Sequence, residues 1–208
     1  MKKSLFLAVV LGFVVFFSLS VLAITIGFEP VSQEVVVGDP ASVNLVISGL
    51  GDYTAPSLGA FDLDITYNPA ILDFTGYTLG LYLGDISLWE AVDLSWGETT
   101  PGTINLAELS LLSVSELDSL QPDSFTLATL TFNTLAVGTS SLDISITALG
   151  DAYGNPLSLD VQSGNISPVP EPATFILIGF GLGGIGILRR KKVILKEYYA
   201  KEFEVLSL

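Results

Sequence analysis

The side chains of this sequence that could do chemistry are almost all carboxylates. Of the 22 acidic residues, 18 lie between Ile24 and Pro170, and that stretch contains no lysine, arginine, histidine or cysteine. The eight basic residues lie near the ends of the chain: Lys2, Lys3, Arg189, Arg190, Lys191, Lys192, Lys196 and Lys201. A serine nucleophile needs a histidine or lysine base beside it, and zinc needs histidine or cysteine ligands. The central part lacks these residues, so only carboxylate chemistry is open to it.

Asp62 and Asp64 form the clearest carboxylate pair. They stand two residues apart on a predicted strand, so both point to the same face, roughly 7 Å from each other. A glycosidase needs two carboxylates across a sugar-binding cleft, and two exposed residues of one strand do not make such a cleft. We therefore expect a non-catalytic protein, and a carbohydrate-active enzyme is the remaining enzymatic alternative.

A bound calcium ion is the second chemistry that these carboxylates could support. Asp62 and Asp64 repel each other, no basic residue offsets them, and calcium prefers several oxygen ligands. Asp151 and Asn155, with Asp160 nearby, form a second candidate calcium site. Neither group has the spacing of an EF-hand. The alternative is a solvated acidic face at the first group and an Asx-type turn at the second.

Four aromatic residues lie in the least regular part of the central sequence: Tyr77, Tyr82, Trp89 and Trp96. Exposed aromatic rings stack on sugar rings, which would suit a polysaccharide matrix. The alternative is that they close the ends of the domain. If Trp89 and Trp96 are exposed and coplanar, they would favour sugar binding, whereas a flat sheet face with exposed apolar residues would favour protein docking.

The charge distribution excludes one class of partner. Nucleic acids are bound through lysine and arginine contacts to phosphates, and the central part has neither residue. An anionic membrane surface would repel it for the same reason. Its possible counterparts are cations, cationic proteins and neutral polymers. The acidity could also serve only to keep the protein soluble.

Alternating apolar and polar residues predict several β-strands in the central part. The pattern is clear over residues 42–48, 61–67, 128–133 and 142–147, and joints rich in Gly, Pro, Asn and Asp separate such segments. Only residues 111–120 suggest a short helix. One-sided alternation over many strands is typical of two packed sheets, so we predict an all-β sandwich over residues 24–166.

The N-terminus is typical of a signal peptide, at residues 1–23. Two lysines precede an apolar run over residues 5–17, and Val21, Leu22 and Ala23 form a small-residue cleavage site. We expect signal peptidase to cut after Ala23. An uncleaved membrane anchor is the alternative.

The C-terminus divides into three predicted segments. Residues 167–172 form a proline-rich linker, and residues 173–188 form an uncharged span. As a helix this span would be roughly 24 Å long, a short transmembrane helix. Residues 189–208 begin with Arg189, Arg190 and two lysines and form a basic cluster with a tail, which the positive-inside rule places in the cytoplasm.

The order of these C-terminal parts resembles the PEP-CTERM sorting signal. The matching residues are Pro170, Glu171 and Pro172, followed by the apolar span and the basic cluster. The resemblance implies processing by exosortase, a membrane-embedded protease. It also implies a Gram-negative source and a final location at the cell surface or in the extracellular matrix. Residues 193–208 extend beyond the usual end of that signal.

The central part resembles cohesin domains. The resemblance rests on residues 59–72 (GAFDLDITYNPAIL), on residues 127–132 and 137–142 (LATLTF and VGTSSL), and on the loop at residues 151–157 (DAYGNPL). It implies a jelly-roll β-sandwich of about nine strands and a module for protein or carbohydrate binding. Cohesins bind dockerins, so a dockerin-like partner is an alternative to exopolysaccharide. No cofactor is expected apart from the possible calcium.

Overall fold

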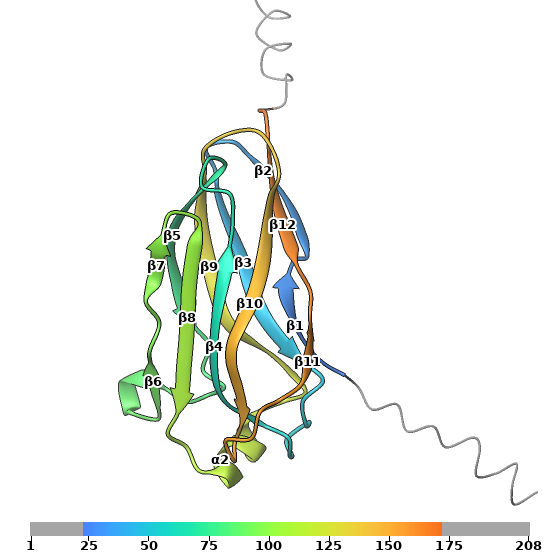
Figure 1. The fold of residues 1–208 in the computed structure, drawn as a ribbon, viewed down its shortest axis with the longest axis vertical. Helices are drawn as coiled ribbons and strands as arrows, with labels where there is room; N and C mark the ends of the chain where they lie inside the picture. Colours follow the sequence, from blue (N-terminus) through green and yellow to red (C-terminus); the bar gives the residue numbers. More distant parts are fainter. Residues whose placement is uncertain (1–22, 172–208) are drawn as a thin grey trace, which may run out of the picture. The chain divides into compact units, whose positions relative to one another are not determined.

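The computed structural model describes residues 23–171. The predicted signal peptide up to residue 22, Pro172, the predicted transmembrane helix at 173–188 and the segment 189–208 with Arg189 and Arg190 lie outside the described residues. Within the described part, strands form two sheets that face each other, and no helix is long and apolar enough to cross a membrane (Figure 1). The prediction of an all-β sandwich is confirmed.

The first sheet has five strands in the order β11-β1-β3-β9-β5. Its elements are β11 (Leu159–Val161), β1 (Ile24–Glu29), β3 (Pro40–Ser48), β9 (Ser124–Thr134) and β5 (Leu72–Leu79). All neighbours are antiparallel except β1 and β11, which pair in parallel. Strand β5 is the edge of this sheet, because it pairs only with β9 among the described strands.

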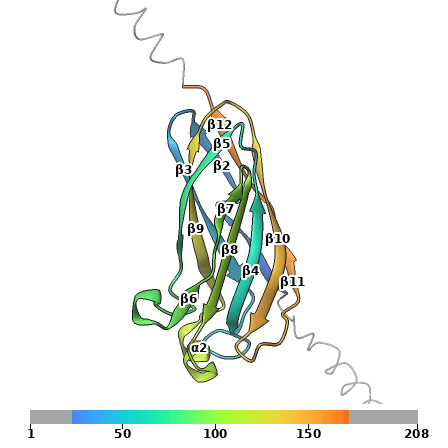
Figure 2. The same ribbon diagram turned by 60° about the vertical axis from the view of Figure 1, so that its left-hand side comes forward.

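The second sheet has seven strands, in the order β2-β12-β10-β4-β8-β6, with β7 also paired to β8. Its elements are β2 (Ser32–Val36), β12 (Gly164–Val169), β10 (Ser140–Asp151), β4 (Leu58–Thr66), β8 (Thr103–Ser110), β6 (Ala91–Asp93) and β7 (Gly97–Thr100). Figure 2 shows β8, β4 and β10 side by side in this sheet. Most of the strands beyond the expected nine or so are short: β6 and β11, for example, have three residues each.

The core lies between the sheets and follows the predicted alternation. In β4, Phe61, Leu63 and Ile65 are buried, whereas Asp62 and Asp64 between them are half-exposed. In β9, Phe132 is fully buried and makes edge-to-face contacts with Tyr67 and Phe74, at ring-centroid distances of 5.3 and 5.7 Å. The period of two therefore separates the apolar core face from the solvent face.

The predicted short helix is α2 (Val114–Leu120), which closes one end of the sandwich. Glu116 accepts hydrogen bonds from the backbone N–H and the hydroxyl of Ser113, as in a capping box. The helix buries Leu117 and delivers Gln121, whose amide side chain bonds both backbone groups of Leu58 at 2.6 and 2.8 Å. Gln121 thereby fixes the start of β4.

The C-terminal edge differs from the sequence-based expectation. The proline-rich linker was expected to begin at residue 167, but β12 continues to Val169 and pairs in parallel with β2. Pro168 is tolerated there because β10 pairs only with the first half of β12, so the missing N–H breaks no second ladder. The chain divides into two units between Val169 and Pro170, three residues later than predicted.

Candidate functional site

Asp62 and Asp64 lie side by side on the outer face of β4, as predicted. The side-chain amide of Asn105, on the neighbouring strand β8, donates hydrogen bonds to both carboxylates at 2.9 and 3.0 Å. A neutral donor from the chain itself therefore occupies the position between the two charges. Calcium binding by this pair stays a prediction.

The second predicted calcium group is only partly assembled. Asp151 caps the turn after β10, because it accepts hydrogen bonds from the backbone N–H groups of Tyr153 and Asn155. The Asn155 amide also bonds this carboxylate, and these bonds, chiefly those from Asn155, lower the pKa of Asp151. Asp160 lies in the other sheet, on β11 beside β1. Among residues 23–171, no group of three or more acidic side chains is arranged to hold a metal ion.

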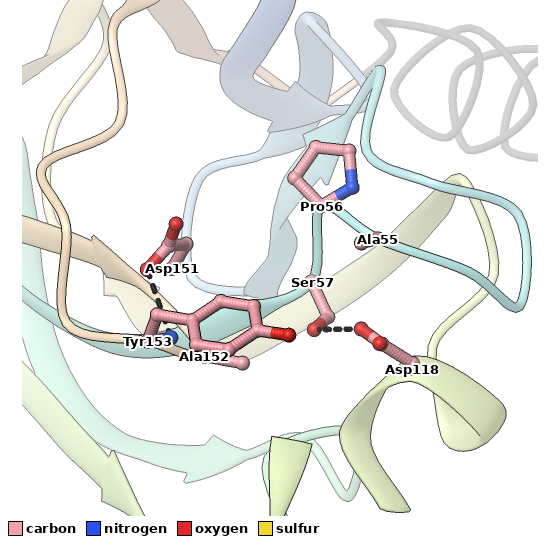
Figure 3. Close-up of a pocket in the computed structure, with 7 residues that line it drawn as sticks. All are labelled: Ala55, Pro56, Ser57, Asp118, Asp151, Ala152 and Tyr153. Carbon is pink, nitrogen blue, oxygen red and sulfur yellow. Dashed lines mark hydrogen bonds between the residues drawn. The ribbon is translucent and has the colours of Figure 1, made fainter. Parts of the chain in front are cut away.

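A hollow of about 290 Å³ lies next to this turn (Figure 3). It is lined by Ala55, Pro56, Ser57, Asp118, Asp151, Ala152 and Tyr153. Ser57 donates a 2.6 Å hydrogen bond to Asp118, and Asp151 is held by its turn. A general acid needs a carboxyl with a raised pKa, whereas that of Asp151 is lowered. The hollow therefore does not provide the acid and base pair of a glycosidase.

The four predicted aromatic residues divide into two pairs. Tyr77 is half-buried and donates a 2.9 Å hydrogen bond to Asp93, and Tyr82 packs on Phe125 at a ring distance of 4.8 Å. Trp89 and Trp96 are 82% and 83% exposed. Tyr77 belongs to the packing of the domain, Tyr82 packs on Phe125 but is still 36% exposed, and the two tryptophans stand in solvent.

The exposed tryptophans belong to a larger surface, which we call the apolar edge. It is formed by nine of the sixteen large hydrophobic side chains that are exposed among the described residues: Leu81, Tyr82, Ile86, Leu88, Trp89, Leu94, Trp96, Leu109 and Leu111. These residues lie in the loop after β5, in the 3₁₀-helix η1 (Ile86–Leu88) and the residue that follows it, in the segment between β6 and β7, and at the end of β8 with the residue after it. Figure 1 shows β6 and β7 at the outer side of β8.

Backbone structure holds the apolar edge in place. Asp85 caps η1 by accepting hydrogen bonds from the Ser87 N–H and hydroxyl, which lower the pKa of Asp85. Trp89 ends η1 with a left-handed backbone, at a φ of 61°. A bulky residue rarely adopts this conformation, and such outliers concentrate at functional sites. The exposed Trp89 ring is therefore presented at some cost in backbone energy.

Glu108 is a residue that sequence reasoning missed. It is 1% exposed, and neither oxygen of its side chain has a hydrogen-bond partner among the described residues. Burial, and secondarily the negative charge of Asp93, raise its pKa to about 8. The sequence did hold a signal, because Glu108 continues the alternate-residue row that begins with Ile104 and Leu106.

A second hollow lies beside Asp93, the residue whose negative charge raises the pKa of Glu108. The hollow has a volume of about 560 Å³, and its lining includes Asp93, Tyr77, Gly80 and Ser87. It lies beside the free edge of β5 and η1, next to the apolar edge. Burial raises the pKa of Tyr77, and its hydrogen bond to Asp93 acts in the same direction.

Comparison with known proteins identifies the tail. Residues 168–192 match the family described as the PEP-CTERM protein-sorting motif. Such a motif indicates an exported protein that is anchored in the membrane and then processed. No curated protein matches the chain.

Several solved cohesins have the same fold. The sixth cohesin of scaffoldin B from Acetivibrio cellulolyticus, solved with a Cel5 dockerin, is 16% identical and has a TM-score of 0.57, with 71% of this chain and 99% of that chain covered. CaCohA2 from Clostridium acetobutylicum is 18% identical, with a TM-score of 0.54 and coverage of 71% and 91%. The cohesin module of a Clostridium perfringens family 33 glycoside hydrolase is 18% identical, with a TM-score of 0.55 and coverage of 72% and 99%.

These findings define the class of the protein. It carries a PEP-CTERM sorting motif, and its described domain has the cohesin fold, as the sequence resemblance implied.

Proposed function

We propose that this chain is an exported, non-catalytic docking module that binds a partner protein through its apolar edge. The observation that carries the proposal is the concentration of exposed hydrophobic side chains between residues 81 and 111. Scattered exposed hydrophobic residues are ordinary, whereas a gathered patch marks an interaction surface. Trp89 and Trp96, each more than four-fifths exposed, are the anchors of that surface.

The partner is expected to carry a basic surface around an apolar centre. The stretch from Ile24 to Pro170 has 18 acidic residues and no basic one, so complementary charge must come from the partner. Asp85, Glu90 and Asp93 lie within the segment that carries the apolar edge. A dockerin-type protein is the specific form of this proposal, because the scaffoldin B cohesin of the same fold was solved with a dockerin.

Export and sorting set the place where docking occurs. The PEP-CTERM motif supports processing of the tail by an exosortase after signal peptidase has removed the N-terminal segment. The docking domain would then act at the cell surface or in the extracellular matrix of a Gram-negative bacterium. Its acidity suits that role, because it keeps the domain soluble and discourages self-association.

Binding of an exopolysaccharide is the second candidate function. The exposure of Trp89 and Trp96 favours it, because free indole faces stack on sugar rings. Both candidates use the same two side chains, so the test must identify the chemical nature of the partner.

Site-specific photo-crosslinking in the native cells separates the two candidates. A photoreactive amino acid at position 96 of the full chain is expected to give one discrete crosslinked product that protease degrades. Polysaccharide binding would instead give a product that resists protease and shrinks with glycoside hydrolase. The same amino acid at position 153 is the matched control, because Tyr153 is also exposed, at 72%, but lies on the turn after β10.

Affinity measurements with the crosslinked partner, once purified, complete the test. Truncation of Trp89 and Trp96 to alanine is expected to weaken binding more than tenfold, while Tyr153→Ala leaves it unchanged. Binding should also weaken as sodium chloride is raised, because a basic partner meets an acidic domain. Equal affinities of the tryptophan and tyrosine variants would contradict the proposal.

A further inference from the structure

Glu108 has no means within the described domain of offsetting its burial. It points between the sheets from β8, in line with the fully buried Ile104 and Leu106. Both carboxyl oxygens lack a hydrogen-bond partner among the described residues. An unpaired buried polar group is costly, and most native structures satisfy such groups with a protein partner, a water or an ion. The described domain therefore supplies no hydrogen-bond donor to the Glu108 carboxyl.

A second carboxylate lies directly beside it. Asp93 of β6 is the register partner of Glu108, and side chains of such cross-strand pairs lie on the same face of a sheet. Asp93 is oriented by two hydrogen bonds of 2.9 Å, from the Tyr77 hydroxyl and from the Ser95 N–H. Two acidic groups thus meet where no lysine, arginine or histidine exists to neutralise them.

The adjoining hollow gives an outside ion a way in. Asp93 and Tyr77 both line the 560 Å³ hollow at the free edge of β5. Asp93 is exposed at this hollow, and the buried Glu108 is its register partner on the neighbouring strand β8. The hollow also has room for the waters that complete the coordination of a large cation.

We propose that Glu108 and Asp93 hold a calcium ion between the two sheets, at the side of the domain that carries the apolar edge. The two carboxylates supply up to four hard oxygen ligands and the charge that a divalent cation requires. Calcium fits better than magnesium, because it accepts irregular coordination by six to eight oxygens. This site differs from the Asp62–Asp64 pair, which the Asn105 amide already bridges, and from the turn at Asp151.

The ion would connect strands that lie next to the apolar edge. Glu108 belongs to β8 and Asp93 to β6, and Tyr77 ties Asp93 to β5 of the opposite sheet. Bound calcium therefore stabilises the arrangement of η1, β6 and β8 that presents Trp89 and Trp96. The inference stands independently of what docks there, because it rests on Glu108, Asp93 and the adjoining hollow and not on the exposed tryptophans.

Thermal unfolding of the full chain in a non-ionic detergent tests the site. Ten millimolar calcium chloride is expected to raise Tm by about 3–5 °C above sodium chloride of equal ionic strength, if the affinity is in the millimolar range of extracellular calcium sites. Magnesium should raise it less. Identical melting curves in calcium and in matched sodium would overturn the proposal and leave Glu108 with a proton alone.

Single substitutions locate the site. Glu108→Gln and Asp93→Asn keep the side-chain shapes and should each abolish the calcium-specific shift. Asp64→Asn is the matched control on the outer face of the same sheet, and it should respond to calcium as the native chain does. A lost response in Asp64→Asn together with a retained one in Glu108→Gln would assign calcium to the outer face and refute the buried site.

Terbium luminescence gives a readout that does not depend on the stability of any variant. Tyr77 bonds Asp93 directly, so a terbium ion at this site would be sensitised by a tyrosine in contact with one of its ligands. The native chain should show sensitised emission that calcium displaces, and Tyr77→Phe should lose most of it. Emission that persists undiminished in Asp93→Asn would also overturn the proposal.

Discussion

Glu108 and Asn105, on the same strand, show two ways in which single residues manage negative charge in a domain without basic residues. Asn105 points outward and donates its amide to Asp62 and Asp64. Glu108 points inward, receives no donor, and its pKa rises to about 8. An outward carboxylate can rely on solvent and a neutral donor, whereas an inward one must bind a proton or an ion.

The titration of Glu108 predicts a stability loss across neutral pH when divalent cations are absent. Its pKa is about 8 in the folded domain and about 4.5 as the ordinary value, so the folded form holds a proton that the unfolded chain has released. The contribution of Glu108 to stability is therefore fully present below its ordinary pKa and falls by about 1.4 kcal/mol per pH unit as pH rises towards 8. Over the whole interval the loss is on the order of 5 kcal/mol.

Urea unfolding from pH 5 to 8 in EDTA, at constant ionic strength, measures this slope. Glu108→Gln should flatten the curve, because the amide carries no titrating proton. Glu34→Gln, an exposed carboxylate of β2, is the matched control and should keep the native slope. A slope unchanged in Glu108→Gln would place the titrating group elsewhere. Asp93 is the acidic group beside Glu108, so Asp93→Asn should lower the pKa of Glu108 and the fall in stability should end at a lower pH than in the native chain.

At the scale of elements, the long strands were predictable and the edges were not. Residues 42–48, 61–67, 128–133 and 142–147 alternate because one face packs on the core, and they became the central strands β3, β4, β9 and β10. Strands β6, β7 and β11 have only three or four residues, too few for a period to be read. These elements are held by pairing with β8 or β1, a tertiary effect absent from local sequence.

The candidate site was predictable only in part, for the same reason. Trp89 and Trp96 stood out by residue type, but their exposure depends on η1 and on short edge strands. Asp62 and Asp64 were correctly placed on one face by alternation, whereas the bridging Asn105 comes from a strand about 40 residues away. Whether two neighbouring carboxylates bind an ion or a hydrogen-bond donor depends on residues from distant segments. The spacing of the carboxylates along the chain does not reveal those residues.

Strand β9 gives a stability prediction at this scale. The Phe132 side chain is fully buried, at 0% exposure, and packs edge-to-face against Tyr67 and Phe74. Phe132→Ala is expected to lower the free energy of unfolding by about 3–5 kcal/mol, because it removes these contacts and leaves a cavity. Denaturant unfolding measures the loss. Asn133→Ala, the next residue on the exposed face, is the control and should change it by less than about 1 kcal/mol.

At the scale of the whole molecule, charge is segregated along the chain. The basic residues lie in the two end segments, and the acidic ones lie mostly in the domain between them. This segregation agrees with the sorting motif at residues 168–192, because basic flanks of an apolar span stay on the cytoplasmic side. The domain between the end segments is left with an uncompensated negative charge.

The sorting motif predicts the fate of tail variants. Glu171→Ala, or removal of residues 189–208, should leave unprocessed chain in the membrane fraction of cells that possess an exosortase, because the motif joins these parts into one signal. Immunoblots of membrane and surface fractions measure processing by the change in size. Glu34→Gln, an acidic change in the domain, should be processed normally. Normal processing of both tail variants would rule out the motif as the sorting determinant.

The uncompensated charge of the domain makes its stability depend on salt in a predictable direction. Between Ile24 and Pro170, 18 carboxylates repel one another with no basic side chain among them. Unfolding moves these charges apart, so repulsion destabilises the folded form.

Monovalent salt screens the repulsion over a Debye length that falls from about 30 Å at 0.01 M to about 8 Å at 0.15 M. Tm should therefore rise steadily as sodium chloride is raised over this range at pH 7, and potassium chloride should act equally. Most proteins of mixed charge lose favourable ion pairs on the same addition, but the described domain has none to lose, since residues 23–171 contain no basic side chain. A Tm that falls with salt would mean that the acidic residues are not a net source of repulsion in the folded domain.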